Sequence, residues 1–410
     1  MILRARTVVP VSRRPIADGA VEVLRGRIVR IGPWREFSDT KRQHSVDLGD
    51  VALLPGLVNA HCHLEYTGMA GQFLPPKYFS DWLKLIVAAK GVQSDADFVE
   101  AWRKGASQLL RTGTTTVADI AALPNILPQP SPLRVIAFLE LTGVRSKRPP
   151  REIVSEAARK IRSLRAAHHP AGFSPHAPYS TTPELLRLAA QTARRQRWRV
   201  TTHVAESAEE FEMFTEARGR MFDWLSSQRD CRDCGRGSPV RHLARAGLLG
   251  ANFLAVHVNC LADGDAGLLS RKRTGVVHCP RSHSFFSHPK FPFKALSSAG
   301  VNICLGTDSL ASLEARRREV PELDMFAEMR SFARKHRDVP PGVVLRMATL
   351  NGAQALGLAG QAGEIIPGAA ADLIALPCRE KLADIYDAVL HHRGDVAASL
   401  IAGRWAVAPA

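Results

Sequence analysis

Strand-type and helix-type segments alternate over about 300 residues, and this feature most constrains the fold of the chain. Short apolar runs recur between longer segments with helical periodicity, and Gly, Pro or polar residues separate them. The runs expected to form strands are 115–119, 135–140, 172–174, 199–202, 253–256, 275–277 and 301–305. Repeated strand-then-helix units predict a parallel (β/α)₈ barrel of the TIM type.

The two ends of the chain have a different texture. Residues before Pro55 alternate apolar and polar side chains between short turns, which is typical of small antiparallel strands. A similar pattern returns after about residue 362, at 371–376 and 398–404. The sequence therefore predicts a small β-sandwich domain from residues 1–54 and 362–410, and the (β/α)₈ barrel over residues 55–361.

Two histidines, His61 and His63, follow the apolar run Val51–Leu54 in the segment PGLVNAHCH. We expect residues 51–54 to form the buried strand that leads to them, with Pro55-Gly56 as a break. Residues two apart on a strand face the same side, so one strand end can offer two imidazoles to a single ion. The pair alone is weak evidence, because polar loop residues of this kind are common.

Further candidate ligands come at later predicted strand ends. His203 follows the stretch 198–202, with Glu206 three residues beyond it. Asp308 follows the strand 301–305 in a turn of small residues, where an Asx turn or a helix cap is the structural alternative. Imidazole and carboxylate donors favour zinc, with iron(II) or manganese(II) as alternatives. A catalytic metal of this type keeps one position open for water.

The segments around these residues resemble the amidohydrolase superfamily, in its metal-dependent deaminase and chlorohydrolase branch. The resemblance is to aminodeoxyfutalosine and S-adenosylhomocysteine deaminases in particular, and it covers nearly the whole chain. The matching segments, in chain order, are PGLVNAHCHLE from Pro55, SPHAPYSTTPELL from Ser174, TTHVAES from Thr201, AVHVNCL from Ala255, VVHCPRSH from Val276, LGTDSLAS from Leu305 and ATLNGAQALGLAGQAGEIIPGAAADLIAL from Ala348.

The resemblance implies hydrolytic deamination of an aminated heterocycle, an adenine-type nucleoside or a related purine or pyrimidine compound. It implies one divalent metal, because the strand 134–140 lacks the lysine that relatives with two metals carboxylate. Carried over by position, the implied residues are the metal ligands His61, His63, His203 and Asp308, the catalytic partners Glu206 and His257, and the substrate contact His176. Asp308 is also the expected proton acceptor. Arg281 and His283, in the segment HCPRSH that lies near the substrate pocket in the family, are further candidate substrate contacts, with packing over the barrel mouth as the alternative for Arg281.

The implied roles agree with the chemistry of these side chains. A metal lowers the pKa of its water to about 7, and Asp308 would take the proton while His257 steadies the nucleophile. Glu206 would protonate a ring nitrogen of the substrate. Structural alternatives remain: His257 as a core histidine, His176 as part of a rigid turn, and Glu206 as a first-turn residue favoured by the helix dipole.

Two other functions remain open. A chlorohydrolase or an amide hydrolase of the same superfamily would use the same attack on another leaving group. A non-catalytic assembly protein is the alternative from another class, but such relatives usually lose ligand histidines. One departure from the family pattern is a charged insertion after Ser312, at 313–319, which puts substrate contacts near Asp308 in doubt.

Composition bounds the partners. A formal charge of +16 is compatible with binding to nucleic acid or to a membrane surface. The basic residues are, however, scattered along predicted helices, so we expect neither partner. A small heterocyclic substrate is expected, and a homodimer is left open. Seven cysteines without a disulfide rhythm, and no recognisable leader, predict a cytoplasmic protein. Cys231 and Cys234 form a single C-x-x-C, which we expect to be a surface loop.

Overall fold

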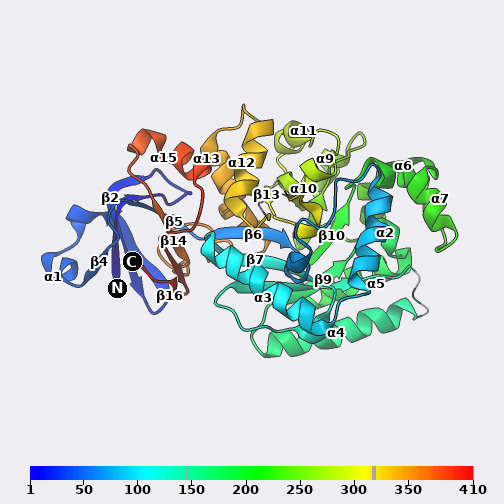
Figure 1. Cartoon of the computed structure of the whole chain (residues 1–410), viewed down its shortest axis with the longest axis horizontal. Coiled ribbons are helices and arrows are strands. Elements are labelled where there is room, and N and C mark those ends of the chain that lie inside the picture. The colour runs from blue at the N-terminus through cyan, green and yellow to red at the C-terminus, as the bar shows by residue number, and fades with distance from the viewer. Residues whose placement is uncertain (145, 147, 316–319, 410) are drawn as a thin grey trace.

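The computed structural model describes residues 1–144, 146, 148–315 and 320–409. Two eight-stranded sheets organise these residues (Figure 1). One is a parallel barrel sheet from the middle of the chain, and the other is a mixed sheet that contains both chain ends. The predicted barrel with a small β-domain built from both ends is therefore confirmed, while the domain boundaries at 54/55 and 361/362 stay a prediction.

The barrel strands follow one another in chain order around the sheet, and every neighbouring pair is parallel. An isolated parallel bridge between Cys62 and Asp308 joins the first strand to the segment after the last. The strands are β6 (Leu57–Cys62), β7 (Thr114–Ala121), β8 (Arg134–Leu141), β9 (Ala171–Pro175), β10 (Val200–Val204), β11 (Phe253–His257), β12 (Gly275–His278) and β13 (Ile303–Leu305).

Helices follow the barrel strands and cover the outside of the barrel (Figure 1). Several carry a narrow apolar face, as in the 17-residue helix from Asp95, whose cap is a complete Ser94–Asp97 capping box. They are α2 (Phe79–Lys90), α3 (Asp95–Arg111), α4 (Pro150–Ala166), α5 (Pro183–Gln196), α6 (Ala208–Glu216), α7 (Arg220–Ser226), α8 (Pro239–Arg245), α9 (Asp265–Arg271), α10 (Pro280–Phe285), α11 (Phe293–Ser298), α12 (Met325–Lys335), α13 (Pro341–Met347) and α14 (Leu350–Ala355).

The mixed sheet has the order β16-β15-β14-β5-β1-β2-β3, with β4 paired to β1. Its own apolar core includes Leu3, Val21, Leu53 and Leu373. Its strands are β1 (Ile2–Val8), β2 (Ile16–Leu24), β3 (Arg27–Pro33), β4 (Ser45–Asp47), β5 (Val51–Pro55), β14 (Leu373–Pro377), β15 (Ala398–Ile401) and β16 (Arg404–Val407). The short helix α1 (Asp39–Arg42) precedes β4, and α15 (Ile385–His391), between β14 and β15, packs against α12 and α13.

The run 51–54 forms a buried strand and lies in the small β-domain, as predicted, but it does not continue into the strand that carries the histidines. It belongs to β5, which pairs with β1 and β14 of the mixed sheet. The barrel strand that carries His61 is the next one, β6. Gly56 separates the two, and a Cβ there would lie only 2.1 Å from Oγ1 of Thr115, so glycine permits the close passage into the barrel.

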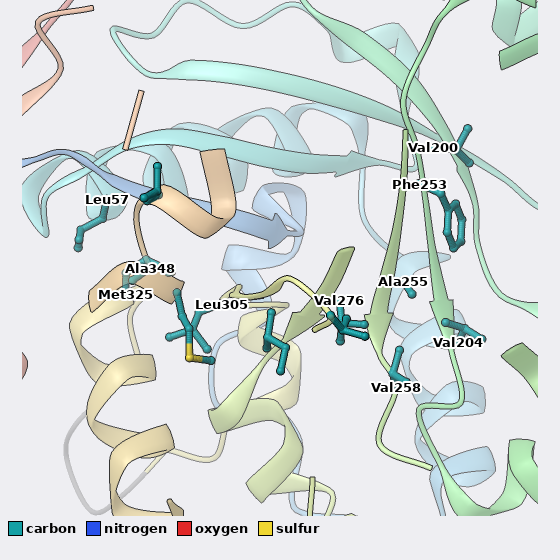
Figure 2. Packing of buried hydrophobic residues seen from close by; sticks show 14 of the residues in the cluster. Leu57, Val200, Val204, Phe253, Ala255, Val258, Val276, Leu305, Met325 and Ala348 are labelled. Carbon is teal, nitrogen blue, oxygen red and sulfur yellow. The ribbon is translucent and has the colours of Figure 1, made fainter. Parts of the chain in front are cut away.

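Alternate residues of the barrel strands enter different cores. On β11, Phe253 and Ala255 join the large cluster outside the sheet, while Leu254 and Val256 join a second cluster. Figure 2 shows side chains of β10, β11, β12 and β13 in the large cluster, together with Met325 of α12. This packing fixes the strands whose ends carry the predicted site.

No helix among the described residues has the length and apolar character needed to cross a bilayer.

Candidate active site

Five side chains converge at the carboxyl ends of the barrel strands. His61 Nε2 lies 3.4 Å from Asp308 Oδ1, His63 Nε2 lies 3.6 Å from the same oxygen, and His63 Nε2 lies 3.3 Å from His203 Nε2. The ring of His257 lies 5.9 Å from that of His61 and 5.5 Å from that of His203. The structure thus brings together residues that are up to 247 positions apart, as the sequence predicted.

The donors of this cluster suit a metal ion. Ligand atoms of His61, His203, His257 and Asp308 all lie within 4.8 Å of one another, and the four residues are buried. Both ring nitrogens of His61, Nδ1 of His63 and Nε2 of His257 have no hydrogen-bond partner among the described residues. Buried polar atoms without partners are costly, and a bound cation would satisfy one ring nitrogen of His61 and Nε2 of His257. This group contains His257, which the sequence placed as a catalytic residue, in place of His63.

Backbone contacts between β6 and the segment after β13 hold the cluster in place. Asp308 N–H donates to His61 O at 3.0 Å, and His63 N–H donates to Asp308 O at 3.4 Å. A Cβ on Gly306 would lie 2.8 Å from His61 O and 2.9 Å from His61 Cβ, so only glycine allows this approach. Asp308 has a left-handed backbone with φ of 56°, a strained state that the two hydrogen bonds support.

His257 is turned into the site by the same device. It ends β11 on the side of Phe253 and Ala255, but its φ of 76° breaks the regular alternation of the strand. Its Nε2 then lies 3.4 Å from Glu206 Oε1. The contact places a catalytic candidate from β11 against one that follows β10.

Burial sets the protonation of the imidazoles and of Asp308. Burial, and then neighbouring imidazoles, lower the pKa of His63 and His203 well below the usual value, and burial lowers the pKa of His257 to about 3. Burial alone would raise the pKa of Asp308, but the adjacent imidazoles, that of His61 first, hold it well below its usual value. Neutral imidazoles and an ionised carboxylate are the forms that bind a metal.

Glu206 has the opposite tendency. Burial, and then the carboxyl groups of Asp308 and Glu210, raise the pKa of Glu206 well above its usual value. Its side chain is 6% exposed. A carboxylic acid kept neutral in this way can donate a proton to a bound molecule, as a general acid requires.

His176 sits beside the cluster, where the sequence placed it. Its Nδ1 lies 2.7 Å from the hydroxyl of Ser180, and its backbone carbonyl accepts a hydrogen bond from His203 Nδ1 at 2.8 Å. That bond fixes the proton of His203 on Nδ1 and leaves the lone pair of Nε2 facing the cluster. The ring of His176 lines the cavity above the cluster, so it can contact a ligand there.

This cavity measures about 380 Å³, and residues of α2 and α7 line part of it. The cluster residues His63, His203, His257 and Asp308 also line it, together with Glu206 and His176. Its walls are mostly aromatic and aliphatic, with Tyr66, Phe79, Trp82, Tyr179, Trp224 and Leu225 among them. A mostly apolar cavity with few convergent polar groups is typical of a small-molecule site.

Arg281 and His283 do not line this cavity, so their predicted substrate contacts lack geometric support. Arg281 Nη1 donates to Glu322 O at 2.8 Å and lies 3.6 Å from the buried Glu328 carboxylate. His283 lines a neighbouring cavity, and its Nε2 is 2.8 Å from Pro289 O. The charged segment predicted after Ser312 lies in part, at 316–319, outside the described residues.

The sequence did not single out several polar residues that support the site. Asp119 accepts hydrogen bonds from Leu64 N–H and from Trp102 Nε1, and so anchors the turn that follows His63. Ser282 Oγ donates to Asp308 Oδ2 at 2.6 Å. The hydrogen bonds of Asp119 and of Ser282 each join residues from different elements, so no local sequence motif could have revealed them.

Glu210 had a usable signal. Its carboxyl group accepts from Ala205 N–H at 3.0 Å and from Glu206 N–H at 2.9 Å, and so holds the turn that presents Glu206. Ser207 Oγ caps the N–H of Glu210 at 3.1 Å. The pattern Ser207-x-x-Glu210 is that of a capping box, and it predicts a side chain that folds back on the helix start.

Glu210→Ala is expected to lower kcat by about 10- to 100-fold and to lower the free energy of unfolding by about 1–3 kcal/mol per unpaired N–H. The buried N–H groups of Ala205 and Glu206 would lose their acceptors, and Glu206 would lose its fixed position. Steady-state kinetics and urea unfolding measure the two effects. Glu212→Ala, on the exposed side of the same helix, is the control; equal kinetics in both variants would contradict a positioning role for Glu210.

Comparison with known proteins gives this geometry a family. The model of the amidohydrolase family matches residues 52–405. A 5-methylthioadenosine/S-adenosylhomocysteine deaminase from Syntrophobacter fumaroxidans is 31% identical over 97% of this chain and 90% of its own length.

Two crystal structures are similar to this chain. One is an adenosine deaminase from Xanthomonas campestris with bound zinc, with a TM-score of 0.82 and 25% identity over 98% of this chain and 92% of that chain. The other is the Helicobacter pylori aminofutalosine deaminase in complex with methylthio-coformycin, with a TM-score of 0.85 and 22% identity over 99% and 100%. The family match and the relative that is similar over nearly its whole length show that the chain belongs to the amidohydrolase family, as a hydrolase of carbon–nitrogen bonds.

Proposed function

We propose that this chain is a metal-dependent deaminase that replaces the amino group of an adenine-type nucleoside by oxygen and releases ammonia. The observation that carries the proposal is Glu206, a buried acid with a raised pKa, placed 3.4 Å from His257 beside the imidazole–carboxylate cluster. Hydrolysis at an amidine carbon needs such a proton donor, because protonation of the ring nitrogen makes the carbon electrophilic.

His61, His63, His203 and Asp308 would hold one divalent ion, zinc in the first place, with iron(II) or manganese(II) as alternatives. When bound, the ion would supply the nucleophile by lowering the pKa of a water to about 7. Support comes from the close approach of these donors and from the unpartnered ring nitrogens. His257 belongs to the group that fits a cation, and we assign it to the catalytic step because it contacts Glu206.

The residues of the chain divide the proton transfers among them. The ionised Asp308 accepts a proton from the attacking water, and His257 hydrogen-bonds that water and orients it. Glu206 gives its proton to the ring nitrogen as the carbon becomes tetrahedral. The proton taken by Asp308 then passes, directly or through His257, to the departing amino group, and the carbon–nitrogen bond breaks. The hydroxyl proton left on the carbon returns to Glu206, so that water and the aminated ring yield the carbonyl compound and ammonia and the acid form of Glu206 is restored.

The substrate class is supported by the relatives and by the cavity. The relative from Syntrophobacter fumaroxidans is named for 5-methylthioadenosine and S-adenosylhomocysteine, and the Xanthomonas campestris structure for adenosine. The aromatic walls can stack on a planar base. We further propose that the protein acts on a small heterocyclic substrate, binds neither nucleic acid nor a membrane, and is located in the cytoplasm; whether it forms a homodimer is left open. The seven free cysteines agree with a reducing compartment.

Ammonia release from a substrate panel tests this function. We expect release from adenosine and 5′-methylthioadenosine, loss of release after treatment with a metal chelator, and recovery on addition of zinc. The panel includes S-adenosylhomocysteine, aminodeoxyfutalosine, guanine, a pterin and a chlorinated triazine. Chloride release without ammonia release would show a chlorohydrolase. Substoichiometric metal after zinc loading, with no turnover of any compound, would favour a non-catalytic protein.

A further inference from the structure

The cavity that His283 lines is separate from the active-site cavity and has basic and aromatic walls. It measures about 360 Å³, and none of its lining residues also lines the active-site cavity. The lining residues come from two segments, 278–291 and 332–336, and none of them is acidic. They are His278, Pro280, His283, His288, Lys290, Phe291, Phe332, Lys335 and His336.

Two lysines of this second cavity lack a partner. The ammonium groups of Lys290 and Lys335 form no salt bridge or hydrogen bond with any residue that the structure describes. Lys335 ends α12, where the helix dipole favours a cation, but Lys290 lies in the loop between α10 and α11. Burial, and then the charge of Lys290, lower the pKa of His336 at the same cavity. The lysines therefore give the cavity a positive potential, which a bound anion would offset.

Buried imidazoles add unpartnered nitrogen atoms beside the lysines. His278 is 2% exposed and His283 is 3% exposed, and Nδ1 of each ring has no hydrogen-bond partner among the described residues. His283 Nε2 lies 2.8 Å from Pro289 O and donates its proton there, because a carbonyl oxygen only accepts. Burial lowers the pKa of His283 to about 4, so the neutral ring keeps a lone pair on Nδ1. The cavity thus combines two charged donors with a buried acceptor.

A metal ion does not suit this group of imidazoles. No three described histidines of the second cavity have ligand atoms that all lie within 4.8 Å of one another, in contrast to the active-site cluster. The two ammonium groups would also repel a cation. An oxyanion suits them better, because its oxygens accept charge-assisted hydrogen bonds from lysine.

Among small oxyanions, inorganic phosphate matches these groups because it both accepts and donates hydrogen bonds. Its oxygens accept from the ammonium groups, and its remaining O–H group can donate to the lone pair of His283 Nδ1. Sulfate and the dianion of a phosphate monoester carry no such proton at pH 8, so they would leave the buried nitrogen unpaired.

We propose that the second cavity binds inorganic phosphate, with Lys290 and Lys335 donating to its oxygens and His283 Nδ1 accepting from its O–H group. His283 follows Ser282 on α10, and Ser282 Oγ donates to Asp308 Oδ2 at 2.6 Å. The phosphate site is therefore next to the segment that supports Asp308, but outside the cavity that takes the substrate. This proposal goes beyond the deaminase function and does not depend on it.

Isothermal titration calorimetry of the metal-loaded full chain at pH 8 tests the site with sodium phosphate, sodium sulfate and phenyl phosphate. Phosphate is expected to bind at least about 10-fold more tightly than the other two, the effect of one hydrogen bond left unmade to a buried group. Lys290→Met and Lys335→Met should each weaken phosphate binding by about 10- to 100-fold, the effect of one hydrogen bond to a charged group. Both lysines are exposed, so these variants should fold.

Two further variants complete the experiment. Lys104→Met, at an exposed position of α3, should keep the wild-type affinity for phosphate. His283→Phe removes the acceptor and should bring the affinities for phosphate and sulfate close together, which a general folding defect would not do.

Three outcomes would overturn the phosphate site. They are no binding of phosphate at millimolar concentration, affinity for sulfate or phenyl phosphate equal to that for phosphate, and unchanged phosphate binding when both lysines are replaced by Met. The last result is the one expected if phosphate bound only at the metal centre. Ammonia release tests the proposed function separately, so the failure of either proposal leaves the other intact.

Discussion

Glu206→Gln is expected to keep the bound metal while kcat for deamination falls by about 10²- to 10⁴-fold, the usual contribution of general acid catalysis. The amide has nearly the same shape as the acid, so the contact at 3.4 Å from His257 can persist. It has no proton of suitable acidity to give to the ring nitrogen. Ammonia release from 5′-methylthioadenosine and metal analysis of the same preparation measure both quantities.

The matched control is Glu212→Gln on α6, the helix that follows Glu206; the carboxylate of Glu212 is exposed and paired with Arg218. It should leave kcat and metal content unchanged. A wild-type rate in Glu206→Gln would show that another group supplies the proton. Loss of metal in that variant would mean that Glu206 belongs to the ligand set, which its raised pKa argues against.

The fold was predictable because its pattern is local and repeated. Each barrel strand is a short apolar run before or after a helix, and parallel connections of this kind close in one hand. Positions at the carboxyl ends of the strands share one face of the barrel, so His61, His203 and Asp308 could be placed together from their order alone. The barrel strand β6 at 57–62 was not among the predicted strands, because the apolar run 51–54 just before it does not show that a second strand begins after the turn at Gly56.

Supporting contacts were predictable only where they lie within a local motif. Glu210 acts within a few residues of the turn that it holds, and its capping pattern is visible in the sequence. Asp119 and Ser282 reach residues on other elements, and only the folded barrel brings them together. Arg281 lies within the segment VVHCPRSH, which resembles a segment near the substrate pocket in the family, but the buried Glu328 and a backbone carbonyl engage its side chain away from the cavity.

His203→Ala is expected to abolish metal retention and activity together. His203 Nδ1–H donates to His176 O, so its Nε2 carries a lone pair at the centre of the cluster, 3.3 Å from His63 Nε2. Loss of a residue that only orients a ligand costs about 10- to 100-fold in metal affinity, and loss of a direct donor should cost more. Metal content after dialysis and ammonia release measure the two effects, and the exposed His169→Ala serves as the control.

The same measurement on two further variants decides the ligand set. His63→Ala should lose metal as His203→Ala does, whereas His257→Ala should keep metal and lose turnover, because His257 orients water and contacts Glu206. The four residues whose ligand atoms lie within 4.8 Å of one another include His257 and leave out His63, so the geometry also allows His257 to bind the metal in place of His63. Metal loss in His257→Ala with retention in His63→Ala would exchange the roles of the two residues. Full metal and turnover in His203→Ala would refute the metal centre as a whole.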